Sequence, residues 1–187
     1  MPRTRPEVRI AGLCGSLRAN SVHARVLKAT RTLFPEYAEL ETSDLPARLP
    51  LFNPDLEADP PRTVTSCREW VAACDGLLLA SPEYAHGISA HIKNTLEWLV
   101  SVPAATDKPV LVINARAGAH HADAALREVL RTMGVVLLGD RSVQLPAFPA
   151  NLSAGDIAAT PDLAQRVQKG LESLFSGVAE SRIAPRS

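Results

Sequence analysis

The chain alternates five times between a short apolar segment and a segment whose apolar residues recur at helical spacing. The apolar segments, which we predict to be strands, are residues 8–14, 38–42, 76–80, 110–114 and 135–143. The helical segments are residues 21–34, 62–74, 88–102, 122–133 and 161–178. Residues 76–80 are apolar throughout, which is typical of a strand covered on both faces. The pattern predicts an α/β fold: a doubly wound five-stranded parallel sheet with helices on both faces.

The length of 187 residues fits a single domain. We expect one domain over residues 1–187, with 1–6 and 181–187 frayed at the two ends. The apolar runs are far shorter than the roughly 20 residues of a membrane helix, and the N-terminal segment makes a poor signal peptide. The three cysteines, Cys14, Cys67 and Cys74, are few and odd in number. We therefore expect a cytoplasmic protein that makes no membrane contact.

Charge narrows the choice of partners. Twenty Lys and Arg residues balance twenty Asp and Glu residues, so the chain has no net charge. A general nucleic-acid binder needs a basic excess, and we expect no nucleic acid as partner. The adjacent His120 and His121 do not indicate a metal site, because neighbouring residues on a helix point about 100° apart. No metal is expected.

The loop after the first strand is the most informative one. In doubly wound folds, ligands bind beyond the carboxyl ends of the strands. There, Gly15 permits a tight turn, Ser16 and Ser21 offer hydroxyls, Arg18 offers a guanidinium, and the next helix presents free N–H groups. This combination indicates a phosphate cradle. The alternative is that Ser21 or Asn20 only caps the helix while Arg18 lies in solvent.

Other phosphate-binding chemistries fit these residues less well. A dinucleotide-binding loop needs G-x-G-x-x-G, whereas only Gly12 and Gly15 are present, and the Gly-Lys-Ser/Thr of a Walker loop is absent. Cys14 at the strand end is similar to the nucleophile of low-molecular-weight phosphatases. Their phosphate-binding arginine lies six residues later, where this chain has Asn20. A small buried residue is the better interpretation of Cys14.

A second motif follows the third strand. Pro82-Glu83-Tyr84 precedes a helix that carries Lys93-Asn94 and Glu97-Trp98. Together with Gly15-Ser16, Arg18 and Ser21, and with the connector at residues 45–53, it resembles the NADPH-dependent FMN reductase family, a branch of the flavodoxin-like proteins. The likeness covers residues 8–138, with both motifs in βα loops.

The resemblance implies a bound FMN whose phosphate lies in the first loop and whose ring lies between the second and third loops. The implied cofactor-binding residues are Gly15, Ser16, Arg18, Ser21, His23, Pro82, Glu83, Tyr84, Ala85, His86, Gly87, Ala115 and Gly118. NADPH, or NADH, would be the reductant in ping-pong turnover. The acceptor would be a quinone, a free flavin, an azo compound or an oxidised metal ion. No catalytic side chain is implied, because FMN carries the chemistry.

The chain departs from the family pattern in three places. His23 and Ala85 stand where the family often has asparagine, and only Gly118 matches the glycine-rich third loop. A protonated His23 would attract the phosphate dianion, which predicts that FMN affinity weakens between about pH 6 and 8. Arg116, in the third loop, is either a surface residue or a partner of the NADPH 2′-phosphate.

The family forms dimers that border the flavin sites. The resemblance therefore implies a homodimer or homotetramer, and we assign Lys93, Asn94 and Trp98 to its interface, where Trp is favoured. Two functions compete with the reductase. One is a flavodoxin-type electron carrier, although such carriers are usually strongly acidic; the other is a non-enzymatic flavin-binding regulatory module.

Overall fold

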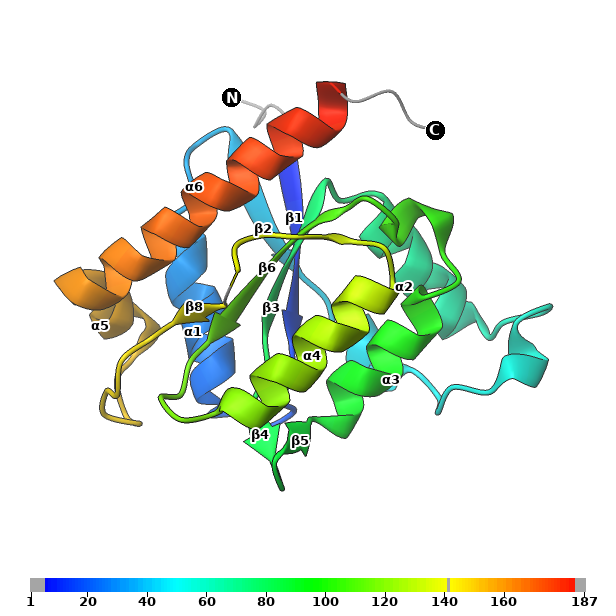
Figure 1. Cartoon of the computed structure of the whole chain (residues 1–187), viewed down its shortest axis with the longest axis horizontal. Coiled ribbons are helices and arrows are strands. Elements are labelled where there is room, and N and C mark those ends of the chain that lie inside the picture. Colours follow the sequence, from blue (N-terminus) through cyan, green and yellow to red (C-terminus); the bar gives the residue numbers. More distant parts are fainter. Residues whose placement is uncertain (1–5, 141, 184–187) are drawn as a thin grey trace.

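The computed structural model describes residues 6–140 and 142–183, which form an α/β fold around one mostly parallel sheet (Figure 1). The sheet order is β2–β1–β3–β6–β7, with β8 also paired to β6. These strands are β1 Val8–Cys14, β2 Ala38–Thr42, β3 Gly76–Ala80, β6 Pro109–Asn114, β7 Val136–Leu137 and β8 Val143–Gln144. The strand order reverses between β1 and β3, where a doubly wound fold places its ligand. The predicted fold class is confirmed.

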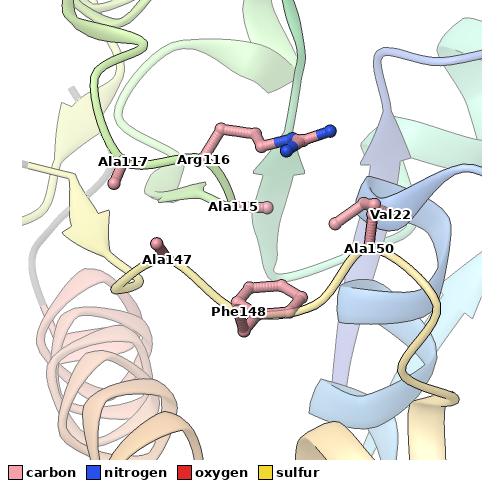
Figure 2. Close-up of a pocket in the computed structure, with 7 residues that line it drawn as sticks. All are labelled: Val22, Ala115, Arg116, Ala117, Ala147, Phe148 and Ala150. Atoms are coloured by element: carbon pink, nitrogen blue, oxygen red, sulfur yellow. The ribbon is translucent and has the colours of Figure 1, made fainter.

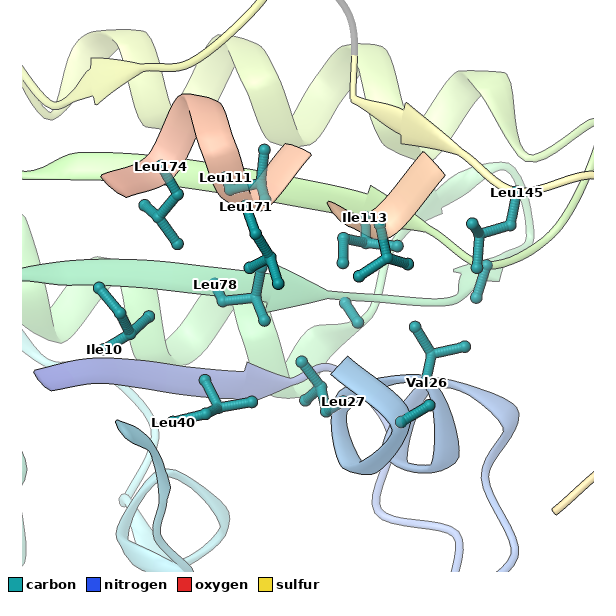
Figure 3. Close-up of a cluster of buried hydrophobic side chains, with 14 of the residues drawn as sticks. Ile10, Val26, Leu27, Leu40, Leu78, Leu111, Ile113, Leu145, Leu171 and Leu174 are labelled. Carbon is teal, nitrogen blue, oxygen red and sulfur yellow. The ribbon is translucent and has the colours of Figure 1, made fainter. Parts of the chain in front are cut away.

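Helices cover both faces of this sheet (Figure 1). They are α1 Val22–Thr32, α2 Arg62–Ala72, α3 Ala90–Leu99, α4 His120–Thr132, α5 Ala154–Ala159 and α6 Pro161–Ile183. Alternate residues of each strand pack into two different hydrophobic cores, one on each face of the sheet, because successive side chains point to opposite faces. Ile10 and Leu78 pack under α1, α5 and α6 (Figure 3), whereas Leu77 and Leu79 pack under α2, α3 and α4. Within the described residues, no helix is long and apolar enough to cross a membrane.

Several local predictions were wrong. The fifth strand is two short strands, β7 and β8, because Gly139 adopts a left-handed φ of 70° that interrupts the extended chain. The hairpin of β4 Glu83–Tyr84 and β5 Gly87–Ile88 was not predicted, and neither was α5, which a capping box at Ser153 begins. α6 continues to Ile183, beyond the end at residue 178 that was predicted for the last helix. The expectations for residues 1–5 and 184–187 lie outside the described residues.

Gly15 brings the first loop against the end of β3. Its N–H donates to the carbonyl of Ala80 at 2.8 Å. A Cβ at this position would lie 2.3 Å from Oγ of Ser81 and 2.8 Å from its Cα, so the backbone at Ser81 would have to shift. A glycine is therefore needed where the first and second loops meet, directly beside the reversal of strand order.

Candidate functional site

The loops after β1, β3 and β6 meet at the carboxyl edge of the sheet and enclose a cleft of about 250 Å³. The lining residues are Ser16, Arg18, Asn20, Ser21, Val22, His23, Arg25, Pro82, Glu83, Tyr84, Arg116, Ala119 and Ala150. Seven of them were predicted from the sequence: Ser16, Arg18, Ser21, His23, Pro82, Glu83 and Tyr84. The cleft thus unites two loops that lie about 60 residues apart in the chain with the loop after β6.

The cleft is cationic. Arg18, Arg25 and Arg116 line it, and Glu83 is the single carboxylate among the described lining residues. The guanidinium groups of Arg18 and Arg116 make no ion pair within the described part of the chain. An arginine without a carboxylate partner is free to bind an anion through two N–H groups at once. The cleft is therefore suited to a phosphate or another oxyanion.

Arg25 lines the cleft and also binds the segment after β8, and neither role was predicted from the sequence. Its Nη1 donates to the carbonyl of Leu152 at 2.8 Å and its Nη2 to that of Ala150 at 2.5 Å. These bonds tie the segment after β8 to the first turns of α1. Its Nε is buried without a hydrogen-bond partner. Arg25 follows the helix-capping Ser21 by four residues, so helical spacing was the signal that could have placed it on the same side.

His23 is the second group with an unpartnered buried nitrogen. The residue is 5% exposed, and its Nε2 has no hydrogen-bond partner among the residues that the structure describes. Burial, followed by the nearby charge of Arg116, lowers the pKa of His23 from 6.5 to about 4. The ring is therefore neutral near pH 7 in the ligand-free protein. Desolvation disfavours the imidazolium, whereas the predicted weakening of FMN affinity between about pH 6 and 8 assumed an ordinary histidine pKa; that change in affinity stays a prediction.

The first loop both caps the N-terminus of α1 and forms one wall of the cleft. Ser21 Oγ accepts the Ala24 N–H at 3.4 Å and caps α1, as the alternative interpretation predicted. The Ser21 N–H donates to the carbonyl of Arg18 at 3.1 Å, and the Arg18 N–H donates to Ser16 Oγ at 3.4 Å. These bonds form a tight loop from which Arg18 borders the cleft. The N-terminus of α1 is thus held beside a cationic cleft, which favours an anion.

The second loop is a tight β-hairpin. Ala85 and His86, at its tip, have left-handed φ values of 49° and 58°. A two-residue turn of this kind favours Asn and Gly, which explains the asparagine that the family often has at the position of Ala85. Ala85, His86 and Gly87 therefore shape the hairpin and do not line the cleft.

Glu83 connects the second loop to α4. One carboxylate oxygen accepts the backbone N–H of Ala122 at 2.9 Å, and the other lies 3.1 Å from Nδ1 of His86. The Ala122 N–H is the main reason that the pKa of Glu83 is lowered, with His86 contributing less. The carboxylate acts as a helix cap for α4 and stays ionised, since a helix N-terminus stabilises negative charge.

Asn114, at the end of β6, organises the third loop. Its Nδ2 donates to the carbonyl of Ala119 at 2.8 Å, and its Oδ1 accepts the Arg116 N–H at 3.1 Å. Gly118 has a φ of 91°, so the loop needs a residue that tolerates this conformation. Sequence reasoning placed Asn114 in the strand and missed this role. A polar residue that ends a buried strand was the available signal.

Arg116 and Ala115 line a smaller recess next to the cleft (Figure 2). Its other walls are Val22, at the start of α1, and Phe148, which follows β8. Figure 2 shows the Arg116 side chain reaching from the third loop toward Val22. Of the remaining predicted site residues, Gly15 and Gly118 shape loops and do not line the cleft.

The Lys93, Asn94 and Trp98 motif of α3 makes its contacts within this chain. Trp98 is 1% exposed, packs edge-to-face on Phe52 with ring centroids 4.9 Å apart, and donates from Nε1 to the carbonyl of Pro50 at 2.8 Å. Asn94 donates to the same carbonyl at 2.9 Å and accepts the Phe52 N–H at 2.8 Å. Trp98 therefore has almost no surface to offer a second chain, which corrects its assignment to an interface. Lys93 pairs with Glu97 on the same helix.

The histidines lie at the other side of the hairpin. The rings of His121 and His86 meet edge to face with centroids 4.6 Å apart, and the ring of His120 lies 4.3 Å from that of His121. Among the described residues, no group of three His, Cys, Asp or Glu side chains is placed to hold a metal ion.

Fold and cleft together define a doubly wound α/β protein with a cationic cleft at the reversal of strand order. The family model for NADPH-dependent FMN reductase matches residues 8–150, and the chain belongs to this family. It is 38% identical over 120 residues to an NADPH:quinone oxidoreductase of Arabidopsis thaliana, a match that covers 61% of each protein. It is 26% identical over 183 residues to a 2-hydroxy-1,4-benzoquinone reductase of Burkholderia sp, covering 94% of this chain and 99% of that one.

A solved structure shows the same fold over nearly the whole chain. FerB, a flavoenzyme NAD(P)H:(acceptor) oxidoreductase from Paracoccus denitrificans, superposes with a TM-score of 0.80 at 24% identity. The match covers 93% of this chain and 98% of FerB. By contrast, the chain spans about three fifths of the plant quinone oxidoreductase.

Proposed function

We propose that this protein is an FMN-dependent NAD(P)H oxidoreductase that passes hydride from NADPH, or NADH, to a small acceptor, with a quinone as the first candidate. The observation that carries the proposal is the cationic cleft at the β1/β3 reversal, in which His23 Nε2 and Arg25 Nε are buried without partners. Membership of the NADPH-dependent FMN reductase family supports the cofactor and the reductant. The names of the plant and Burkholderia relatives support the quinone.

The residues of the cleft fit the phosphate end of FMN. A phosphate monoester carries a charge of about −1.5 to −2 at pH 7. Arg18 and Arg116 have no carboxylate partners within the described chain, and the N-terminus of α1 lies beside them. A phosphate would also give the unpartnered N–H groups the acceptors that buried donors require. We assign Arg18, Arg116 and the N–H groups of the first loop to phosphate binding.

The second and third loops would frame the flavin ring. When bound, FMN supplies the hydride chemistry, and the chain supplies binding and orientation. Glu83 fixes the hairpin to α4 and Asn114 fixes the third loop, so both walls are held before a ligand enters. Tyr84 is 50% exposed at the rim. We propose that the reductant and the acceptor bind one after the other at this open side of the cleft, which predicts ping-pong kinetics.

The phosphate assignment is tested by Arg18→Ala. Loss of a hydrogen bond to a charged group is expected to weaken FMN binding roughly 10- to 150-fold. Riboflavin, which lacks the phosphate, should bind the parent weakly and the variant equally weakly. The matched control is Arg48→Ala, because Arg48 is exposed and, within the described residues, forms an ion pair only with Asp44. Unchanged FMN affinity in Arg18→Ala would refute the assignment.

Turnover is tested separately. Anaerobic NADPH should bleach the visible bands of the FMN-loaded protein, and a quinone should restore them. A flavodoxin-type carrier or a regulatory module would bind FMN without steady-state NADPH-dependent quinone reduction. Double-reciprocal plots that intersect, in place of parallel lines, would contradict the ping-pong proposal.

We also propose a cytoplasmic homo-oligomer, a dimer or a tetramer. Three free cysteines in the described chain support a reducing compartment. Leu51 is 84% exposed and lies on the connector whose backbone Trp98 and Asn94 bind. We propose Leu51 as a contact between subunits, since Trp98 itself is buried. Light scattering of the parent and of Leu51→Ser measures the oligomer and the contribution of this side chain.

A further inference from the structure

The break in the fifth strand opens a groove on the α6 side of the sheet. β7 ends at Leu137 and β8 begins at Val143, and both pair with β6. The groove has a volume of about 340 Å³, within the range of small-molecule pockets. It shares no lining residue with the cationic cleft, so it is a separate candidate site.

The floor of the groove is apolar. Leu111 from β6, Leu138 after β7 and Val143 at the start of β8 line it. α6 lies close against this floor because residue 170 is glycine: a Cβ there would lie 2.5 Å from Cγ2 of Val143. An apolar ligand surface would be removed from water on this floor, which is favourable in proportion to the area buried.

The rim carries positive charge. Arg166, Lys169 and Ser173 stand on one side of α6, at spacings of three and four residues. Arg166 is paired with Asp162 at 3.0 Å, whereas Lys169 makes no ion pair within the described chain. No carboxylate occurs among the described residues that line the groove. A ligand with an anionic group would find an available cation there.

A buried hydroxyl belongs to one of the residues that line the groove. Ser142 is 4% exposed, and its Oγ has no hydrogen-bond partner within the described part of the chain. Buried polar groups in folded proteins nearly always have partners, so an unpartnered one that lines a groove points to a ligand. Ser142 and Lys169 both line the groove, which therefore offers an oxyanion one hydroxyl and one cation.

We propose that this groove binds an amphiphilic carboxylate, an acid with an aliphatic or aromatic body. The body would cover Leu111, Leu138 and Val143, and the carboxylate would bind Lys169 and the hydroxyl of Ser142. Inorganic phosphate would leave the floor uncovered, and a neutral alcohol would not use Lys169. The combination of an apolar floor with an unpaired cation selects this class over both.

Octanoate is the probe, titrated into the full chain with excess FMN and followed by amide ¹H–¹⁵N spectra. We expect saturable shifts at Ser142, Val143 and Gly170. Lys169→Glu removes an attraction that contributes up to about fivefold in affinity, at about 1 kcal/mol for one exposed ion pair, and adds a repulsion of similar size, so octanoate binding should weaken about fivefold. Lys28→Glu, an exposed charge reversal on α1, is the matched control and should bind octanoate like the parent.

Two further measurements test the hydroxyl and the apolar floor separately. Ser142→Ala should weaken octanoate but leave 1-octanol unchanged, and inorganic phosphate should bind far more weakly than octanoate. The proposal fails if octanoate does not saturate, if Lys169→Glu binds it like the parent, or if octanol binds as tightly. It fails as well if the shifted amides are those of Arg18 and Arg116, or if the shifts reflect self-association seen by light scattering. None of these outcomes depends on turnover.

Discussion

The buried His23 should make the stability of the ligand-free protein depend on pH. The ordinary pKa of 6.5 falls to about 4 in the folded chain. Between these values the unfolded chain binds a proton that the folded chain does not, so a falling pH favours unfolding. The stabilisation is full above pH 6.5 and is lost as the pH approaches 4. The whole pKa difference corresponds to about 3 kcal/mol, of which about 2 kcal/mol is lost by pH 5.

The measurement is urea unfolding of FMN-free parent and His23→Asn at several pH values from 7 to 5. Asparagine does not titrate, so the free energy of unfolding of the parent should fall about 2 kcal/mol more than that of the variant. Carboxylates that titrate in the same range cancel in the difference between the two proteins. The matched control is His86→Asn, because the His86 side chain is 78% exposed, and its pH curve should follow that of the parent.

Parallel curves for parent and His23→Asn would refute the burial of a neutral His23. The same linkage sets the direction of FMN binding. A phosphate dianion beside His23 would raise the pKa of the imidazole, so FMN binding should be accompanied by proton uptake at His23. Because the phosphate also takes up a proton near pH 6, the contribution of His23 is measured as the difference in FMN affinity between parent and His23→Asn. The lowered pKa of His23 moves its expected contribution to a lower pH than the window of 6 to 8 predicted from the sequence.

Three further changes test how the loops are built. Ala85→Gly relieves a left-handed φ of 49° and should stabilise the fold by about 1 kcal/mol; an unchanged midpoint of thermal unfolding would contradict this strain. Gly15→Ala places a Cβ 2.3 Å from Ser81 Oγ and should cost about 1–3 kcal/mol in urea, which Ser81→Gly should partly restore. Trp98→Ala should cost about 3–5 kcal/mol by the same assay; a near-neutral effect would contradict its packing and its bond to Pro50.

Much of the fold was predictable because it rests on local patterns. The apolar run of β3 and the helical spacing after each strand depend on residues close in the chain, and the structure has both where they were predicted. The first loop was predictable for the same reason, because its features lie within seven residues of one another: Gly15 makes the turn, Arg18 carries the charge and Ser21 caps the helix. The hairpin, the broken fifth strand and α5 were missed, since each depends on two to six residues with a weak periodic signal.

The roles of single side chains in the cleft were decided by contacts between distant segments. Glu83 meets Ala122 and Arg25 meets Leu152 across 39 and 127 residues, and no periodicity links such pairs. Trp98 shows the same limit, because its spacing fits an interface as well as a core, and only the position of the Pro50 carbonyl distinguishes them. The family resemblance placed His23 at the end of the first loop, and the structure has it in the lining of the cleft. Its neutral state follows from burial and from Arg116, which the fold alone brings near it.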